Sequence, residues 1–98
     1  MRWKFARDAN HSPLKAAFEA HGWLVFDTSD SRTLGLDFIV IRRGRVVAVE
    51  AKDGEKVPSA RKLTPSEEKT RDRCRTHGVE WRLVMSVEDV RALSSVQP

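Results

Sequence analysis

The stretch that decides the fold reads Leu36-Asp-Phe-Ile-Val-Ile41, then Arg42-Arg-Gly-Arg45, then Val46-Val-Ala-Val-Glu-Ala-Lys52. Two runs rich in β-branched residues enclose a short segment with a glycine, which is the pattern of a β-hairpin. We expect Arg43 and Gly44 to form its two-residue turn. Side chains of a strand alternate between the two faces of a sheet, so this register places Asp37 opposite Glu50 on one face.

Asp37 and Glu50 form a pair of carboxylates at the end of the hairpin away from the turn, and Lys52 follows on the same face. Their Cβ atoms are expected about 5 Å apart, where like charges repel unless something offsets them. One interpretation is a solvated rim in which Lys52 bridges the two acids. The other is a hard divalent cation such as Mg²⁺, which prefers oxygen ligands. Glu50 favours the cation, because the run Val46 to Ala51 is otherwise wholly apolar.

The flanking sequence supplies helices and further strands. In chain order we expect a helix at about 10–21, a strand at 23–26, the hairpin, a helix at about 65–76, a strand at 80–85 and a short final helix to about 93. This order predicts an α/β fold with a mixed sheet flanked by helices. The crossover through the second helix places the last strand parallel to the second strand of the hairpin.

The second helix has a clearly marked start. Thr64 is the expected N-cap, Pro65 takes the first helical position, and Glu67 stands three residues after the cap. This arrangement predicts a capping box, in which Thr64 and Glu67 bind each other's backbone amides. Most other side chains of this helix are charged, which predicts a helix that is weakly docked or lies against a partner.

Length and composition restrict the class of protein. Ninety-eight residues, 40% hydrophobic and 33% charged, indicate a single folded domain over residues 1–98, with 94–98 expected as a frayed tail. No run approaches the ~18 apolar residues of a membrane span, and the N-terminus is too charged for a secretory signal. The one cysteine excludes an internal disulfide and a Cys-rich zinc site. We therefore expect a soluble cytoplasmic protein, and its net charge of +4 favours a polyanionic partner.

Two short motifs resemble a known nuclease signature. Gly35-Leu36-Asp37, followed after twelve residues by Glu50-Ala51-Lys52, is similar to the PD-(D/E)XK motif, and the order of elements resembles the core of that superfamily. Lys52-Asp53-Gly54, the segment from Ser59 to Pro65, and Ser86-Val-Glu-Asp89 narrow the resemblance. Together they resemble the small stand-alone VRR-NUC (virus-type replication-repair) nucleases of phages and bacteria over residues 8–93.

The resemblance implies a fold, an activity and a metal site. The fold would be restriction-endonuclease-like, with an αβββαβ core and a short C-terminal helix. Asp37 and Glu50 would bind Mg²⁺ or Mn²⁺ with the backbone carbonyl of Ala51, and Lys52 would orient or help deprotonate the attacking water and offset charge at the phosphate. The protein would be an endodeoxyribonuclease acting on structured or branched DNA in replication, repair or recombination, in the cytoplasm of a bacterial or phage-infected cell.

Three positions depart from the family's pattern. Leu36 stands where the family has proline before its first Asp. His11 stands where relatives often carry a metal-binding glutamate in the first helix, and it is either a further metal ligand or a helix-cap residue. Glu67 stands where the family often has a glutamine that faces the site, although the capping box also accounts for this residue.

Basic residues mark the expected DNA-binding surface. They lie in the hairpin turn, in the loop after Lys52 and on the second helix, where a phosphate backbone would reach the carboxylates. The candidates are Arg42, Arg43, Arg45, Lys56, Arg61, Lys62, Lys69 and Arg73. We also expect a homodimer, because so small a core has few loops to hold a duplex and two active sites suit paired cuts. The alternative is a non-catalytic nucleic-acid-binding or assembly module that keeps the fold.

Overall fold

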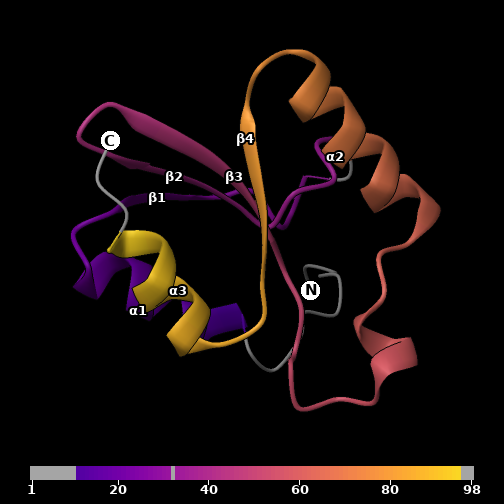
Figure 1. Cartoon of the computed structure of the whole chain (residues 1–98), viewed down its shortest axis with the longest axis horizontal. Coiled ribbons are helices and arrows are strands. Elements are labelled where there is room, and N and C mark those ends of the chain that lie inside the picture. The colour runs from indigo at the N-terminus through magenta and orange to yellow at the C-terminus, as the bar shows by residue number, and fades with distance from the viewer. Residues whose placement is uncertain (1–10, 32, 96–98) are drawn as a thin grey trace, which may run out of the picture.

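One mixed sheet of four strands organises the chain, and helices lie on both of its faces (Figure 1). The computed structural model describes residues 11–31 and 33–95. In chain order the elements are α1 (His11–Ala20), β1 (Leu24–Asp27), β2 (Phe38–Arg42), β3 (Arg45–Ala51), a short 3-10 helix η1 (Pro58–Arg61), α2 (Pro65–Thr76), β4 (Glu80–Val84) and α3 (Val87–Ser94). The predicted α/β class and order of elements are confirmed, and η1 is an addition within the basic loop.

The β2–β3 hairpin has the predicted register. The two strands are antiparallel, with Arg42 opposite Arg45 and Ile39 opposite Ala48. Arg43 and Gly44 form the turn with φ angles of 51° and 80°, so both lie in the left-handed region that a type I′ turn requires. β1 pairs antiparallel with β2, and β4 pairs parallel with β3 after the crossover through α2, as predicted.

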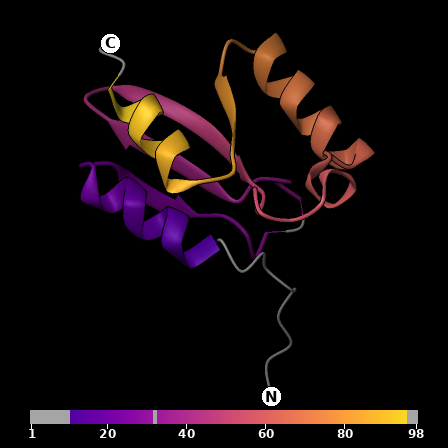
Figure 2. The same cartoon turned by 60° about the horizontal axis from the view of Figure 1, so that its bottom comes forward.

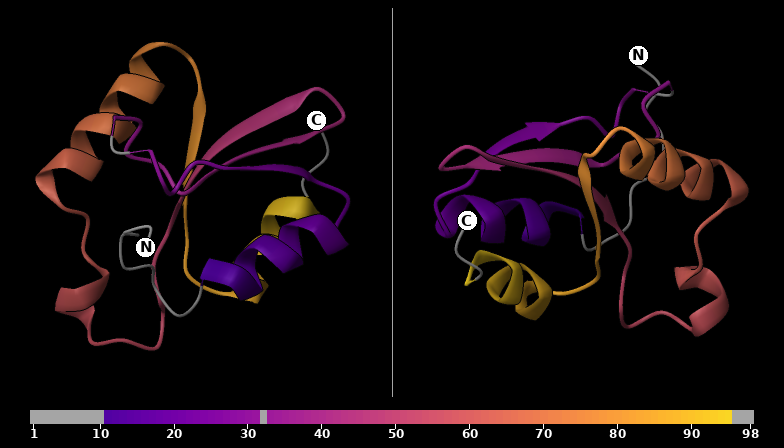
Figure 3. Two further views of the ribbon diagram at one scale, coloured as in Figure 1. Left: turned by 180° about the vertical axis from the view of Figure 1, so that it is seen from behind. Right: turned by 45° about the horizontal axis from the view of Figure 1, so that its top comes forward.

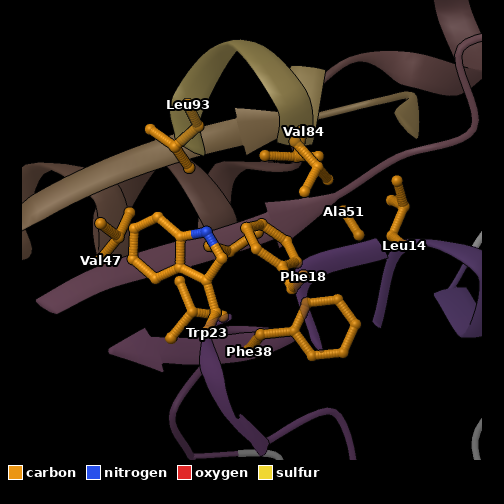
Figure 4. Close-up of a cluster of buried hydrophobic side chains, with 11 residues drawn as sticks. Leu14, Phe18, Trp23, Phe38, Val47, Ala51, Val84 and Leu93 are labelled. Carbon is orange, nitrogen blue, oxygen red and sulfur yellow. The ribbon is translucent and has the colours of Figure 1, made fainter. Parts of the chain in front are cut away.

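Helices α1 and α3 lie together on one face of the sheet, and α2 lies on the other side, beside β4 (Figure 2). The alternation of side chains along the strands separates two cores. The larger core, shown in Figure 4, is between the sheet and the helices α1 and α3. Its fully buried members are Leu14, Phe18, Phe38, Val40, Val47, Val49, Val84 and Val90. The smaller core, on the α2 side, contains Leu36, Ala48 and Trp81.

Arg42 and Arg45 close the larger core at the turn end of the hairpin. Their guanidinium carbons lie 5.1 and 5.6 Å from the ring centre of Trp23, which is buried. Both side chains also donate to carbonyl oxygens at the C-terminal ends of α1 and α3. Arg45 binds the two carboxylate oxygens of Glu80 at 3.0 and 2.7 Å. These arginines therefore hold the hairpin to the helices beneath it.

Ser94, predicted as the start of a frayed tail, belongs to the folded core. Ser94 is the last residue of α3 and is buried. Its hydroxyl accepts a hydrogen bond from Trp23 Nε1 at 2.8 Å and donates one to the carbonyl of Val90 at 2.7 Å. Because the indole N–H needs a buried partner, Ser94 belongs to the core. Residues 96–98, and Asn10 at the predicted start of the first helix, lie outside the described residues.

The start of α2 is the predicted capping box. Thr64 accepts a bond from the backbone N–H of Glu67, and the Glu67 carboxylate accepts one from the N–H of Thr64 at 2.8 Å. No residue of α2 is buried, which confirms the weak docking expected from its charge. Its last turn instead places the Arg75 guanidinium 5.7 Å from the ring centre of Trp81. Across residues 11–31 and 33–95, the helices are too short or too polar to span a membrane.

The turn provides a test of the hairpin geometry. Arg43 holds a left-handed conformation that asparagine adopts more easily, so Arg43→Asn should raise the free energy of unfolding by about 0.5–1 kcal/mol. Gly44→Ala should lower it by about 1 kcal/mol through backbone strain alone, because a Cβ at Gly44 would meet no atom within 4 Å. Urea unfolding measures both changes. A loss of stability in Arg43→Asn would contradict this account of the turn.

Candidate active site

Asp37 lies directly before β2 and is fixed by three hydrogen bonds with the backbone. Its N–H donates to the carbonyl of Val49 at 3.1 Å, and its own carbonyl accepts from the N–H of Thr28 at 2.9 Å. Its side-chain Oδ2 accepts from the N–H of Ala51 at 2.8 Å. Asp37 therefore bridges β1, β2 and β3, and its carboxylate is held against the end of β3.

Glu50 meets Asp37 as the register predicts. Its side chain is buried, at 6% exposure, and shares a hydrogen bond with the carboxylate of Asp37. Burial, this hydrogen bond and the charges of Asp37 and Glu67 raise the pKa of Glu50 from 4.5 to about 10, against the opposing effect of Lys52. Without a cation, Glu50 is therefore protonated at neutral pH and donates to Asp37. In this structure the two carboxyl groups share a proton at the place where the sequence predicts a metal ion.

Lys52 and Glu67 form an ion pair at the edge of the carboxylates. Lys52 Nζ lies 2.9 Å from Glu67 Oε1, and the two side chains are only 13% and 19% exposed. Burial works against the charge of Glu67, but the bond from the Thr64 backbone and the contact with Lys52 keep its pKa below the ordinary value. Glu67 thus caps α2 and faces the site at once, and the two roles left open by the sequence are compatible.

A hollow of about 270 Å³ opens over the carboxylates. Its lining comes from the loop between β1 and β2, from the hairpin and from the first turn of α2. The lining residues are Ser29, Ser31, Gly35, Leu36, Asp37, Glu50, Thr64, Ser66 and Glu67. The hydroxyl groups of this wall were not predicted as site residues. For Ser29 and Ser31 the sequence signal is the concentration of Ser and Thr before Gly35.

Gly35 allows the loop between β1 and β2 to pack closely against α2. Its φ of 65° is left-handed, and a Cβ at this position would lie 2.6 Å from Thr70 Oγ1. Any other residue would push the loop away from α2 or strain the backbone. The glycine before Leu36 and Asp37 is therefore a packing requirement as well as part of the motif.

The carboxyl oxygens of Asp37 and Glu50 have the chemistry that Mg²⁺ and Mn²⁺ prefer. Two facing carboxyl groups that share a proton can exchange it for a cation, and Mg²⁺ is commonly held by one or two carboxylates with water and a phosphate. Asp37 and Glu50 would supply these ligands, with the Ala51 carbonyl as the predicted third. Within the described part of the chain, no group of three or more His, Cys, Asp or Glu side chains is placed to hold a metal. The protein ligands would therefore be few.

His11 lies on the opposite side of the sheet from the carboxylate pair. Its ring packs on Phe38 with centroids 4.6 Å apart, and Phe38 points into the larger core whereas Asp37 points toward α2. His11 Nε2 is 3.6 Å from Asp27 Oδ1. Both ring nitrogens are buried without a hydrogen-bond partner among the described residues, so the predicted capping role is not seen. The contacts connect His11 to Asp27, and they do not bring it to Asp37 or Glu50.

The predicted DNA-binding residues fall into two groups. Arg42 and Arg45 are occupied by the internal contacts described above, at the end of the hairpin away from the carboxylates. The others lie at the surface or near it, in the turn, in the loop that leaves β3 and on α2. They are Arg43, Lys56, Arg61, Lys62, Lys69 and Arg73, of which only Arg61 is partly buried.

Comparison with known proteins gives one informative similarity. A solved structure described as a VRR_NUC domain matches with a TM-score of 0.64 and 26% identity, over 86% of this chain and 92% of that chain. No family model matches the sequence, and no curated protein matches it significantly. The structural match supports the resemblance seen in the two short motifs.

The buried proton predicts an unusual pH dependence of stability. Because the pKa of Glu50 is raised from 4.5 to about 10, the unfolded chain binds fewer protons between these pH values and stability falls as pH rises through that window. Glu50→Gln keeps the hydrogen bond to Asp37 without the titration. In EDTA it should be more stable than the parent by about 1–3 kcal/mol near pH 7, with a larger gain at higher pH.

Urea unfolding in EDTA across the neutral range measures this difference. Glu88→Gln is the matched control, since the Glu88 side chain is 71% exposed on α3. The control should follow the parent at every pH. An advantage of Glu50→Gln that stays constant with pH would contradict the buried proton.

Proposed function

The fold and the structural match assign this chain as a VRR-NUC domain, a nuclease-type domain, and on this premise we propose that it is a metal-dependent endodeoxyribonuclease. The observation that carries the proposal is the pair of carboxyl groups of Asp37 and Glu50, hydrogen-bonded to each other in a hollow beside Lys52. The reaction proposed is hydrolysis of phosphodiester bonds in structured or branched DNA during replication, repair or recombination.

Each side chain of the site has a role in this proposal. Asp37 and Glu50, with the Ala51 carbonyl, would hold Mg²⁺ or Mn²⁺, and Glu50 would release its carboxyl proton to water on becoming a ligand. The bound ion would act as a Lewis acid toward water and phosphate. Lys52 lies next to the carboxylates, and its ion pair with Glu67 favours the ammonium form. We therefore assign Lys52 to offsetting charge at the phosphate rather than to deprotonating water.

The surroundings of the hollow suit a phosphate backbone. Ser31 and Ser66 line it, and their hydroxyl groups can donate to phosphate oxygens. Basic residues continue from it along the loop after β3 and along α2, where Lys69 and Arg73 are exposed. We propose this path as the DNA-binding surface, in a protein that acts as a homodimer in the cytoplasm of a bacterial or phage-infected cell.

A non-catalytic DNA-binding module is the second candidate. Two observations favour it: among the described residues no three His, Cys, Asp or Glu side chains are placed to hold a metal together, and Lys52 is already paired with Glu67. Such a module would bind DNA without cutting it. The cleavage experiment below separates the two candidates.

Cleavage should depend on the metal and on three side chains. With branched, flapped and linear DNA, the parent should cut in Mg²⁺ or Mn²⁺ and not in EDTA. Asp37→Asn, Glu50→Gln and Lys52→Met should each reduce the rate by about 10²-fold or more, because each removes a ligand or the charge at the phosphate. The control Glu88→Gln should cut like the parent. DNA that is bound at low salt but never cut would favour the non-catalytic module.

The salt dependence of DNA binding should identify the surface. Lys62→Ala and Arg73→Ala should each reduce the log–log salt slope of binding by about 0.9 per lost phosphate contact, whatever the DNA sequence. Arg91→Ala is the control, since Arg91 lies on α3 across the sheet and its side chain is 64% exposed. Binding titrations at several salt concentrations measure the slopes. Slopes equal to that of the parent would exclude these residues from the interface.

A further inference from the structure

A second hollow adjoins the one over the carboxylates, and we call it the side hollow. It has a volume of about 270 Å³ and lies between the loop that joins β1 to β2 and one side of α2. Leu36 lines both hollows, so the two meet at this side chain. Figure 3 shows the loop beside α2 from two directions.

The floor of the side hollow is largely apolar. Leu34, Leu36 and Val79 supply aliphatic side chains, and the thiol of the half-buried Cys74 lies among them. Leu34 and Val79 are 44% and 38% exposed, so this concave apolar surface is left in water. A concave apolar surface with a few polar groups is typical of a ligand subsite.

The polar groups of the side hollow come mainly from α2. Arg73 and His77 line it one helical turn apart, and both are exposed. A guanidinium group binds phosphate oxygens, and an imidazole ring offers a flat face on which a nucleobase can stack. Among the described residues, none that lines the side hollow is acidic, in contrast to the hollow over the carboxylates. The side hollow therefore combines an apolar floor with a basic rim.

We infer that the side hollow receives an unpaired nucleobase of the DNA strand whose phosphate lies at Asp37 and Glu50. The inference deepens the proposed function and rests on it, because it requires DNA bound over the carboxylates. A nucleobase has two apolar faces and is joined through its sugar to an anionic phosphate. The apolar floor and the cation of Arg73 match these two parts.

The size of the side hollow favours a single base. Sites for drug-sized ligands have volumes of roughly 300–1,000 Å³, so a hollow of about 270 Å³ suits one base and not a base pair. Taking a base out of a duplex is unfavourable, and least so when the base is already single-stranded. Flaps and branch points supply such bases. The side hollow would therefore favour structured DNA over a continuous duplex.

A tight contact between the loop and α2 separates the two hollows. Gly35 lines the hollow over the carboxylates and Thr70 lines the side hollow, and a Cβ at Gly35 would lie 2.6 Å from Thr70 Oγ1. The loop backbone and α2 therefore touch at this boundary. The contact holds the two hollows side by side, as a phosphate and the base of an adjoining nucleotide require.

DNA that lacks single bases tests the inference without any need for cleavage. Binding of flapped DNA is measured at low salt in EDTA, with an abasic tetrahydrofuran unit placed at each position of the unpaired strand in turn. At one position the abasic unit should weaken binding to the parent about tenfold, because no base then stacks in the side hollow. A 2-aminopurine base at that position should change its fluorescence when the protein binds.

Two variants connect this loss of affinity to the side hollow. Leu34→Ala removes part of the apolar floor, and Cys74→Leu fills the space. Each should weaken binding of intact flapped DNA about fivefold, make the abasic position indifferent and leave the affinity for a continuous duplex unchanged. Leu24→Ala is the matched control, since Leu24 is another exposed leucine, at 56%, and lies on β1 outside the side hollow. It should behave like the parent on every DNA.

Three outcomes would overturn the inference. They are a scan with no sensitive position, a sensitive position that persists in both variants, and variants that bind flapped DNA and duplex equally less well. The last would place these residues in the fold or at the phosphate backbone. Cleavage of the same DNA in Mg²⁺ keeps the two proposals apart. Cutting without a sensitive position contradicts only the side hollow, a sensitive position without cutting contradicts only the nuclease, and a protein that binds no DNA contradicts both.

Discussion

The register of the β2–β3 hairpin is the constraint on which the rest of the structure depends. It is set at the turn, where Arg43 and Gly44 both take left-handed conformations. From the turn onward, successive cross-strand pairs point alternately into the larger core and toward the α2 side. A slip of one residue would bury Asp37 and Glu50 among the aromatic rings under α1 and bring Phe38 and Val49 to the surface. Burial of the hydrophobic core therefore fixes the register, and the register fixes the positions of Asp37 and Glu50.

The two ends of the hairpin carry opposite charges for different reasons. At the turn, Arg42 and Arg45 are stabilised by the Trp23 ring and by carbonyl oxygens at helix ends, where cations are favoured. At the other end, Asp37 and Glu50 face each other, and the shared proton removes one of their two negative charges while the Ala51 N–H and Lys52 partly offset the other. The first end is built for stability. The second is costly for the fold, as functional sites often are.

The sequence predicted what depends on local pattern. Turn residues, alternation and caps gave the hairpin register, the Thr64–Glu67 capping box and the meeting of Asp37 with Glu50. Contacts between distant segments could not be predicted from the sequence. Nothing near Arg42 and Arg45 in the chain reveals that Trp23 lies beneath them, and their binding to DNA stays a prediction. Ser94 was assigned to a tail because its partner, the Trp23 indole, is 71 residues away. His11 was expected as a cap or ligand, and its burial against Phe38 depends on how α1 crosses the sheet.

The weak docking of α2 has a consequence for motion. The floor of the hollow is formed by strands in the middle of the sheet, whose amides open only when much of the molecule unfolds. Its wall is the first turn of a helix with no buried residue, held by a capping box and one ion pair to Lys52. Local opening should therefore be far easier in the wall than in the floor, and amide hydrogen exchange should be fast along α2 and slow along β3. A bulky polymer can then be admitted by displacing the wall, while the carboxylates beneath it keep their positions.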